Sequence, residues 1–193
     1  LTEEIAKEKG IIIDIKDFER KLKEHQDLSR ESSAQMFKGG LANHSEKTTK
    51  LHTAHHLLLA ALQNILSPDI KQKGSNITEE RLRLDFNFDR KLTEEEKKSV
   101  EDWVNDKINS NLKMVRREMP LEEAIKIGAE MEFGAKYPEI VSVYFAEDKD
   151  GNVYSKEFCG GPHFESIPSL GKFKIIKEEA VASGIRRIKA DLI

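Results

Sequence analysis

The chain has 193 residues, of which 35% are charged and 38% are hydrophobic, and its formal net charge is −3 at pH 7. This composition is typical of a soluble, charge-rich globular protein with one or two domains. The negative net charge argues against general electrostatic capture of nucleic acid, and the single cysteine excludes an intramolecular disulfide. No apolar run approaches the ~18 residues of a membrane-spanning helix and no signal peptide is evident, so we expect a cytoplasmic protein.

Residues 1–45 are expected to form a helical linker. Phe18, Leu22 and Leu28 lie roughly on one side of an expected helix, and its other side is rich in charged residues. A glycine-containing loop at residues 37–45 is the best candidate for a domain boundary. The absence of an initial Met suggests that the segment was cut from a longer polypeptide.

A helix is expected from its N-cap Ser45 to about Leu66, because Pro68 cannot continue it. His52 and His56 are four residues apart on this helix, so both imidazoles leave the same face, one turn above the other. Two metal ligands on a helix need this geometry, although an isolated pair of this kind is more often a chance feature.

Strands and two further helices are expected beyond this helix. The clearest alternation places Leu82, Leu84 and Phe86 on one face of a strand, with Arg83 and Asp85 on the other. In chain order we expect a polar loop at 72–76, a strand at 81–88, a helix from 93 that begins with a Thr-x-x-Glu capping box, a strand at 112–119, a short helix at 120–128, strands at 141–145 and 153–158 joined by an Asp-Gly turn, and strands at 171–177 and 185–190. This order favours an α+β fold, in which an antiparallel sheet packs with helices as a two-layer sandwich.

A second group of possible metal ligands lies in the C-terminal part of the chain. Cys159, the only cysteine, and His163 are separated by two glycines and a proline. Soft sulfur combined with imidazoles suits zinc better than magnesium or calcium. We therefore predict a zinc site made of His52, His56, Cys159 and His163, although a lone cysteine is usually just a small buried hydrophobe.

From residue 52 onward the chain closely resembles the editing domain of alanyl-tRNA synthetases. The family's His-Thr-Ala-Thr-His-Leu-Leu helix motif stands here as His-Thr-Ala-His-His-Leu-Leu at residues 52–58. The other matching motifs are Gln-Lys-Gly-Ser at 72–75, Leu-Arg-Leu-Asp-Phe at 82–86, Met-Pro-Leu-Glu-Glu-Ala at 119–124, Phe-Gly-Ala-Lys-Tyr at 133–137, Cys-Gly-Gly-Pro-His at 159–163, Gly-Lys-Phe-Lys-Ile at 171–175 and Gly-Ile-Arg-Arg-Ile at 184–188. The resemblance implies that residues 46–193 are an editing domain. It also implies that residues 1–45 connect the tRNA-binding helical part of a synthetase to this editing domain. The remainder of that synthetase is an expected partner.

The chain departs from the family pattern at three points. His55 stands where the family has Thr, and Ala135 stands where it usually has Glu. The small β-barrel subdomain with a Gly-Gly-Gln motif, which most alanyl-tRNA synthetases carry ahead of the histidine helix, has no counterpart in residues 1–50. We therefore expect a shortened form, closer in architecture to the editing domain of bacterial threonyl-tRNA synthetase.

The reaction that the resemblance implies is hydrolysis of the ester that joins Ser or Gly to alanine-specific tRNA. A synthetic pocket sized for Ala cannot exclude Gly and rejects Ser weakly, so a second, hydrolytic selection step is required. Thr53 and Gln72 are plausible hydrogen-bonding selectors of the substrate. Arg83 and Asp85 are plausible supports behind them, although an ordinary ion pair explains these two equally well.

The predicted zinc site raises a question about coordination. Four protein ligands make a closed tetrahedron of the structural type, whereas a catalytic zinc usually keeps one position free. We expect Cys159 or His163 to be held loosely, with the metal orienting the ester or the terminal ribose. A water activated by the metal or by His55 would then be the nucleophile.

Contact with the tRNA acceptor end is expected to be local. Basic residues outnumber acidic ones between residues 171 and 193, and Lys172, Arg186 and Lys189 are the candidates for phosphate contacts. A solvated sheet face explains the same residues almost as well.

Two other classes of protein fit parts of this pattern. A zinc-stabilised, non-catalytic module that binds tRNA or protein would keep all four ligands closed around the metal. A free-standing editing factor is a third possibility. A metal-dependent peptidase does not fit, because position 53, where such enzymes carry a glutamate, is Thr.

Overall fold

The computed structural model describes residues 17, 20, 21, 23, 41–132 and 135–193. The chain divides into two units, residues 1–37 and residues 38–193. In the first unit Asp17 forms ion pairs with Arg20 and, at 3.0 Å, with Lys21. The remainder of the expected linker helix lies outside the described residues, and the domain division at residue 45 stays a prediction.

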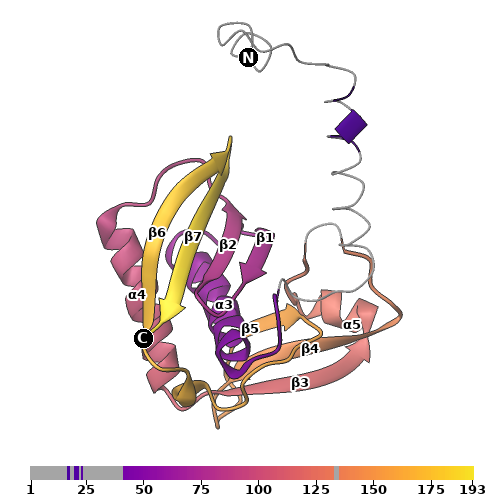
Figure 1. Ribbon diagram of the computed structural model, residues 1–193. Helices are drawn as coiled ribbons and strands as arrows, with labels where there is room; N and C mark the ends of the chain where they lie inside the picture. Colours follow the sequence, from indigo (N-terminus) through magenta and orange to yellow (C-terminus); the bar gives the residue numbers. More distant parts are fainter. Residues whose placement is uncertain (1–16, 18–19, 22, 24–40, 133–134) are drawn as a thin grey trace, which may run out of the picture. The chain divides into compact units, whose positions relative to one another are not determined.

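The second unit is built from helices and strands in mixed order (Figure 1). Its helices are α3 (Glu46–Ile65), α4 (Glu94–Asn109) and α5 (Leu121–Lys126), with a 3-10 turn, η1, at Ile167–Leu170. Its strands are β1 (Gln72–Ile77), β2 (Leu82–Asn87), β3 (Lys113–Pro120), β4 (Ile140–Glu147), β5 (Val153–Phe158), β6 (Phe173–Ala182) and β7 (Ile185–Leu192).

The strands form two antiparallel sheets, and the α+β class is confirmed. One sheet has the order β1-β2-β7-β6 and the other the order β3-β4-β5. A single sheet was expected, but β3 pairs with β4 along its whole length and β4 pairs with β5, which makes a separate second sheet. Helix α3 contacts β1 and β2 of the first sheet and β5 of the second, and lies between them (Figure 1).

Helix α3 is the centre of the core because it is apolar on several sides. Ser45 caps its start by accepting a hydrogen bond from the Thr48 amide at 3.3 Å, as expected for this residue type. All residues from Leu51 to Leu62 are buried. A helix apolar on several sides is stable only when it is enclosed, and here both sheets and α4 enclose it.

Most of the expected elements are confirmed, including the capping box in which Thr93 and Glu96 satisfy each other's backbone amides at the start of α4. The polar loop expected at residues 72–76 is wrong, because these residues form strand β1. It is an edge strand whose only fully buried residue is Ile77, so the apolar alternation that marks other strands is missing. Pairing of its backbone with β2 fixes it instead. Within the described part of the chain, no helix is long and apolar enough to cross a membrane.

Candidate metal centre

Four possible metal ligands come together between α3 and the loop that follows β5. His52 and His56 lie on α3, and Cys159 and His163 lie on the loop. One donor atom from each residue lies within 4.8 Å of the other three. The loop is fixed to the second sheet, because the Cys159 amide donates to the Ser142 carbonyl oxygen at 3.2 Å and the Ser142 hydroxyl donates to the Cys159 carbonyl at 2.6 Å.

The thiol of Cys159 is at the centre of this group. Its Sγ lies 3.4 Å from His52 Nε2 and 3.3 Å from His163 Nε2, and it accepts the Gly161 amide at 3.4 Å. The rings of His52 and His163 stack with centroids 4.0 Å apart. The sulfur and two imidazole nitrogens therefore already converge on one small volume.

Hydrogen bonds fix which ring nitrogen of His52 faces the sulfur. Nδ1 lies 2.9 Å from the carbonyl oxygen of Pro162, which can only accept, so Nδ1 carries the proton. Nε2, on the side of Cys159, is then left with a free lone pair. Metal-ligating histidines are commonly oriented by a carbonyl in this way.

Thr53 orients His163 by a similar arrangement. The hydroxyl donates to the Thr49 carbonyl at 3.1 Å, accepts the Phe164 amide at 2.9 Å and lies 3.3 Å from His163 Nδ1. Because its only proton is directed at Thr49, Oγ1 accepts from His163, and Nε2 of that ring keeps a lone pair towards Cys159. The Thr53 side chain is fully buried. Its expected role in selecting the substrate stays a prediction.

His56 differs from the other two histidines of the group. Its Nδ1 is buried and has no hydrogen-bond partner in the described structure, while its Nε2 lies 3.7 Å from Glu157 Oε2. Glu157 is buried at the end of β5 and accepts the Ser155 hydroxyl at 3.0 Å. A buried imidazole nitrogen without a partner is costly, and a metal ion would satisfy it.

Burial keeps the histidines of this region neutral. It lowers the pKa of His52 to about 4, and it lowers the pKa of His56 and of His163 well below the usual value. The neighbouring imidazoles lower the pKa of His56 and His163 further. Burial also raises the pKa of the Cys159 thiol to about 12. Neutral imidazoles are the form that binds metals, and a bound cation would favour the thiolate. The residues present therefore fit a metal ion.

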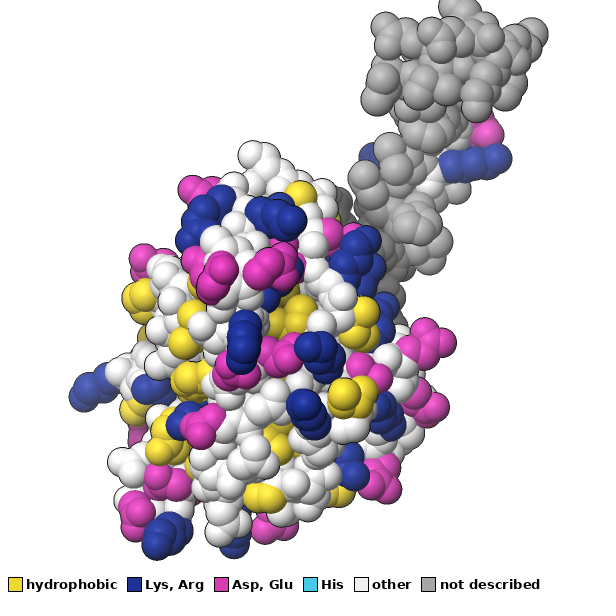
Figure 2. Space-filling model, turned by 90° about the vertical axis from the view of Figure 1, so that its left-hand side faces the viewer, with side chains coloured by type: hydrophobic (Ala, Val, Ile, Leu, Met, Phe, Trp, Pro, Cys, Tyr) yellow, Lys and Arg dark blue, Asp and Glu magenta, His cyan; other side chains and the backbone are white. Residues whose placement is uncertain are grey.

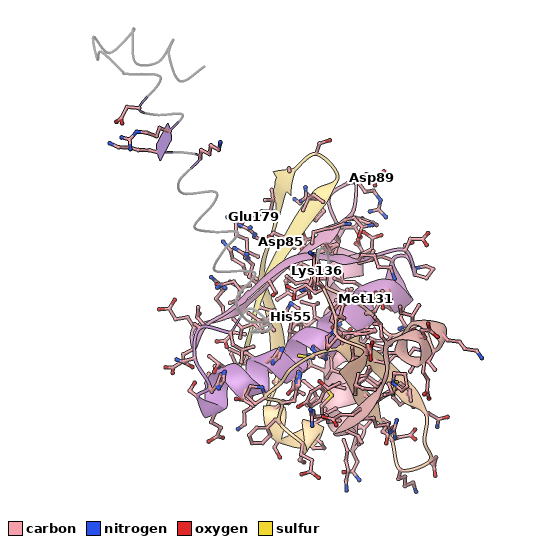
Figure 3. The ribbon with its side chains drawn as sticks, turned by 90° about the vertical axis from the view of Figure 1, so that its right-hand side faces the viewer. His55, Asp85, Asp89, Met131, Lys136 and Glu179 are labelled. Carbon is pink, nitrogen blue, oxygen red and sulfur yellow. The ribbon has the colours of Figure 1, made fainter. Side chains whose placement is uncertain are left out.

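His55, labelled in Figure 3, does not belong to this group, although its ring centroid lies 6.4 Å from that of His56. It is buried on α3, its Nε2 has no hydrogen-bond partner in the described structure, and burial lowers its pKa to about 3. No histidine side chain shows among the described residues on the face drawn in Figure 2, where Lys and Arg are interspersed with Asp and Glu. Of the four candidate ligands, His52, His56 and Cys159 are buried and His163 is half-buried.

The other predicted site residues do not join the four donors. Gln72 is half-buried at the start of β1, opposite Phe86. Asp85 forms two hydrogen bonds with Arg187, at 2.6 and 2.8 Å, and lies 3.7 Å from Arg83. The three residues predicted to contact tRNA are spread out, with Lys172 exposed, Arg186 paired with Glu178 and Lys189 paired with Glu179.

Gly161 is required in the loop that carries two of the donors. Its φ is +70°, and a Cβ atom built there would lie 2.5 Å from the Tyr144 hydroxyl oxygen. We expect Gly161→Ala to lower the free energy of unfolding and to weaken metal binding, because a non-glycine residue in this region costs about 1–3 kcal/mol and Tyr144 must also move. Gly184→Ala is the matched control, since its φ is +68° and nothing lies within 4 Å. Equal effects of the two changes on thermal unfolding and zinc affinity would contradict this account.

Comparison with known proteins finds one matching family model and several similar proteins. Residues 141–189 match the family model described as the threonyl and alanyl tRNA synthetase second additional domain. The whole chain is 52% identical, over 192 residues, to the alanine--tRNA ligase of Treponema denticola and 51% identical, over 193 residues, to that of Borrelia hermsii. Over 74% of the chain, it is also 46% identical to 16% of the alanine--tRNA ligase of Cytophaga hutchinsonii.

The chain spans 31% and 32% of the length of the Treponema and Borrelia relatives. The resemblance that the sequence motifs indicated is confirmed: over its full length the chain is similar to part of the alanine--tRNA ligases, and residues 141–189 match the second additional domain of threonyl and alanyl tRNA synthetases.

Proposed function

We propose that residues 46–193 form an editing domain that hydrolyses the ester of Ser or Gly with alanine-specific tRNA, at a zinc site made of His52, His56, Cys159 and His163. The observation that carries the proposal is the convergence of these four donors inside a relative of alanine--tRNA ligases. The partners of the domain would be the acceptor end of the tRNA and the remainder of the synthetase.

Zinc suits this donor set best. One thiolate and three imidazoles are borderline-soft ligands, which zinc accepts in a tetrahedron, whereas magnesium and calcium prefer oxygen. When bound, zinc would act as a Lewis acid that polarises the ester carbonyl. His52 and His163 would hold it through Nε2, because Pro162 and Thr53 occupy the opposite nitrogen of each ring.

The substrate preference follows from the need to spare correctly charged tRNA. A hydrolytic site must bind the hydroxyl of Ser, because Ala differs from Ser only by that group. We assign this role to Gln72, whose half-buried amide can both donate and accept. Thr53 has its hydroxyl engaged in three contacts and is better suited to holding His163. His55, with a pKa of about 3, is a weak base at neutral pH and is better suited to hydrogen bonding than to proton removal.

Deacylation of alanine-specific tRNA charged with Ser, Gly or Ala tests the proposal. We expect loss of Ser or Gly with Ala spared, by roughly 10⁴-fold for Ser over Ala if a buried group binds the hydroxyl. Hydrolysis of all three esters at the same rate would contradict it. The same assay with the whole ligase would show whether a silent isolated domain needs its neighbours.

A zinc-stabilised, non-catalytic module that binds tRNA or protein is the second candidate. The observation in its favour is that all four donors are protein side chains, which is the pattern of structural zinc sites. The two candidates differ in what removal of the metal does. A structural site would lose its fold with the metal, whereas an editing site would lose hydrolysis and keep the fold.

A further inference from the structure

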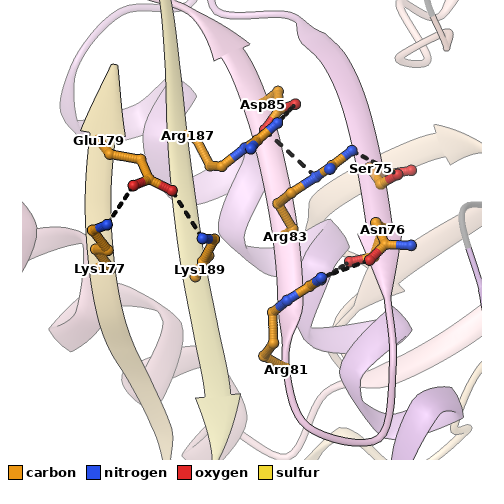
Figure 4. Close-up of polar contacts among 9 residues, drawn as sticks. All are labelled: Ser75, Asn76, Arg81, Arg83, Asp85, Lys177, Glu179, Arg187 and Lys189. Carbon is orange, nitrogen blue, oxygen red and sulfur yellow. Dashed lines mark hydrogen bonds and ion pairs between the residues drawn. The ribbon is translucent and has the colours of Figure 1, made fainter. Parts of the chain in front are cut away.

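One face of the four-stranded sheet is polar and points away from the core. Along β2 the side chains of Leu82, Leu84 and Phe86 are buried, so the alternate residues Arg83 and Asp85 project from the opposite face. Figure 4 shows that face, on which arginines and lysines from three adjacent strands stand close together.

Three cations on this face lie directly opposite one another. Arg83 on β2 pairs in register with Lys189 on β7, and Lys189 pairs in register with Lys177 on β6. We call these three residues the cation row. Adjacent strands are only about 4.8 Å apart, and like charges directly opposite in a sheet are destabilising. The folded chain therefore keeps a row that does not serve its own stability.

The neighbouring row shows the arrangement that does stabilise a sheet. Asp85, Arg187 and Glu179 follow one another across the same three strands, so the charges alternate in sign. Arg187 donates two hydrogen bonds to Asp85, at 2.6 and 2.8 Å. The sheet thus pairs opposite charges in one row and leaves three like charges in the next.

The cation row is only partly neutralised. Glu179 is shared by Lys177 and Lys189, at 2.5 and 2.9 Å, and Asp85 is already bound by Arg187. Arg83 lies 3.7 Å from Asp85, an ion pair too long for a hydrogen bond, and it donates to the Ser75 carbonyl at 3.5 Å. Its buried Nε has no hydrogen-bond partner in the described structure.

Arg81 extends the positive face beyond the row, and it donates hydrogen bonds to the carbonyl and side-chain amide oxygens of Asn76. Among the residues drawn in Figure 4, the side chains of Arg81, Arg83, Arg187, Lys177 and Lys189 are cationic, and those of Asp85 and Glu179 are acidic. The whole chain has a net charge of −3, so this excess is local. An external anion would satisfy donors that the protein itself leaves open.

We propose that the cation row binds the phosphate groups of the tRNA backbone. Phosphate oxygens accept charge-assisted hydrogen bonds from guanidinium and ammonium groups, and guanidinium binds them in bidentate geometry. The side chains of Arg83, Lys189 and Lys177 are 27%, 33% and 59% exposed, so their tips reach solvent. The identity of the polyanion as tRNA rests on the proposed function, whereas the row itself does not.

The double variant Arg83→Gln with Lys177→Gln tests this proposal in the 193-residue chain. It removes both ends of the row and leaves the Lys189–Glu179 ion pair in place. Binding of alanine-specific tRNA that carries no amino acid is measured by fluorescence anisotropy at several salt concentrations. We expect weaker binding and a slope of log K against log salt that is shallower by about 1.5, because each lost contact with single-stranded or duplex phosphates removes about 0.7–0.9. The free energy of unfolding should stay close to that of the unmodified chain, because the relieved like-charge contacts offset the lost ion pairs of Lys177 with Glu179 and of Arg83 with Asp85.

The matched control is Lys98→Gln with Lys149→Gln, which removes the same charge from exposed positions on α4 and the β4–β5 turn. An unchanged slope in the row variant, an equal change in the control, or weaker binding accompanied by lower stability would overturn the proposal. Failure of the proposed function would appear separately, as absence of ester hydrolysis both by the unmodified chain and by the whole ligase. The row would still stand if its variant lost tRNA affinity with the expected change in slope.

Discussion

Replacing Cys159 or His163 with alanine should abolish zinc-dependent hydrolysis and leave the fold intact. Each change removes a donor from the group of four. Loss of a residue that only supports a metal ligand can lower zinc affinity by about 100-fold, so loss of a ligand itself should lower it further. The core does not depend on either residue, because it is built from the buried side chains of α3, α4 and the first sheet. Circular dichroism and thermal unfolding would report the fold, and metal analysis would report bound zinc.

His44→Ala is the control for these variants, because His44 is exposed and lies outside the group. It should change neither zinc content nor hydrolysis. Unfolding of the Cys159 and His163 variants would contradict the editing proposal and favour the non-catalytic zinc module. Full hydrolysis by either variant would contradict the assignment of the metal ligands.

Thr53→Val should weaken zinc binding by about 10- to 100-fold, the range for loss of a residue that orients a metal ligand. Valine has nearly the shape of threonine, so the change mainly removes the hydroxyl. The Phe164 amide and His163 Nδ1 then lose their acceptor inside the protein. A buried unpaired donor costs about 1–3 kcal/mol, so the free energy of unfolding should also fall.

Thr53→Ser restores the hydroxyl and should recover most of the zinc affinity, which separates the hydrogen bonds from the packing of the methyl group. Isothermal titration with zinc, together with unfolding in urea, measures both effects. Unchanged zinc affinity in Thr53→Val, with lost discrimination between Ser-tRNA and Ala-tRNA, would favour the role in substrate selection.

Local pattern was enough to predict the helix that carries two of the donors. A helical period marked α3, Ser45 marked its start and Pro68 its end, and the four-residue spacing placed His52 and His56 on one face. Spacing cannot show that Cys159 lies beside a helix 107 residues earlier. That proximity depends on how β5 packs against α3. Before the structure it rested on the metal-binding chemistry of the four residues and on the resemblance to a family.

Other features left no readable trace in the sequence. Strand β1 has no apolar alternation because it lies at the edge of its sheet, and it therefore looked like a loop. Glu157 lies on a strand, where an acidic residue usually faces water, yet it is buried beside His56. The role of Thr53 depends on a contact with His163 across the fold. The cation row depends on the register of three strands, which the sequence does not specify.

The most direct test of the account is the rate of Ser-tRNA hydrolysis as zinc is removed with a chelator and then restored in steps. We expect the rate to fall to background in the metal-free protein and to rise in proportion to bound zinc, reaching a maximum at one ion per chain. Full activity in a folded, metal-free protein would contradict the central claim that the site of His52, His56, Cys159 and His163 works through a bound metal.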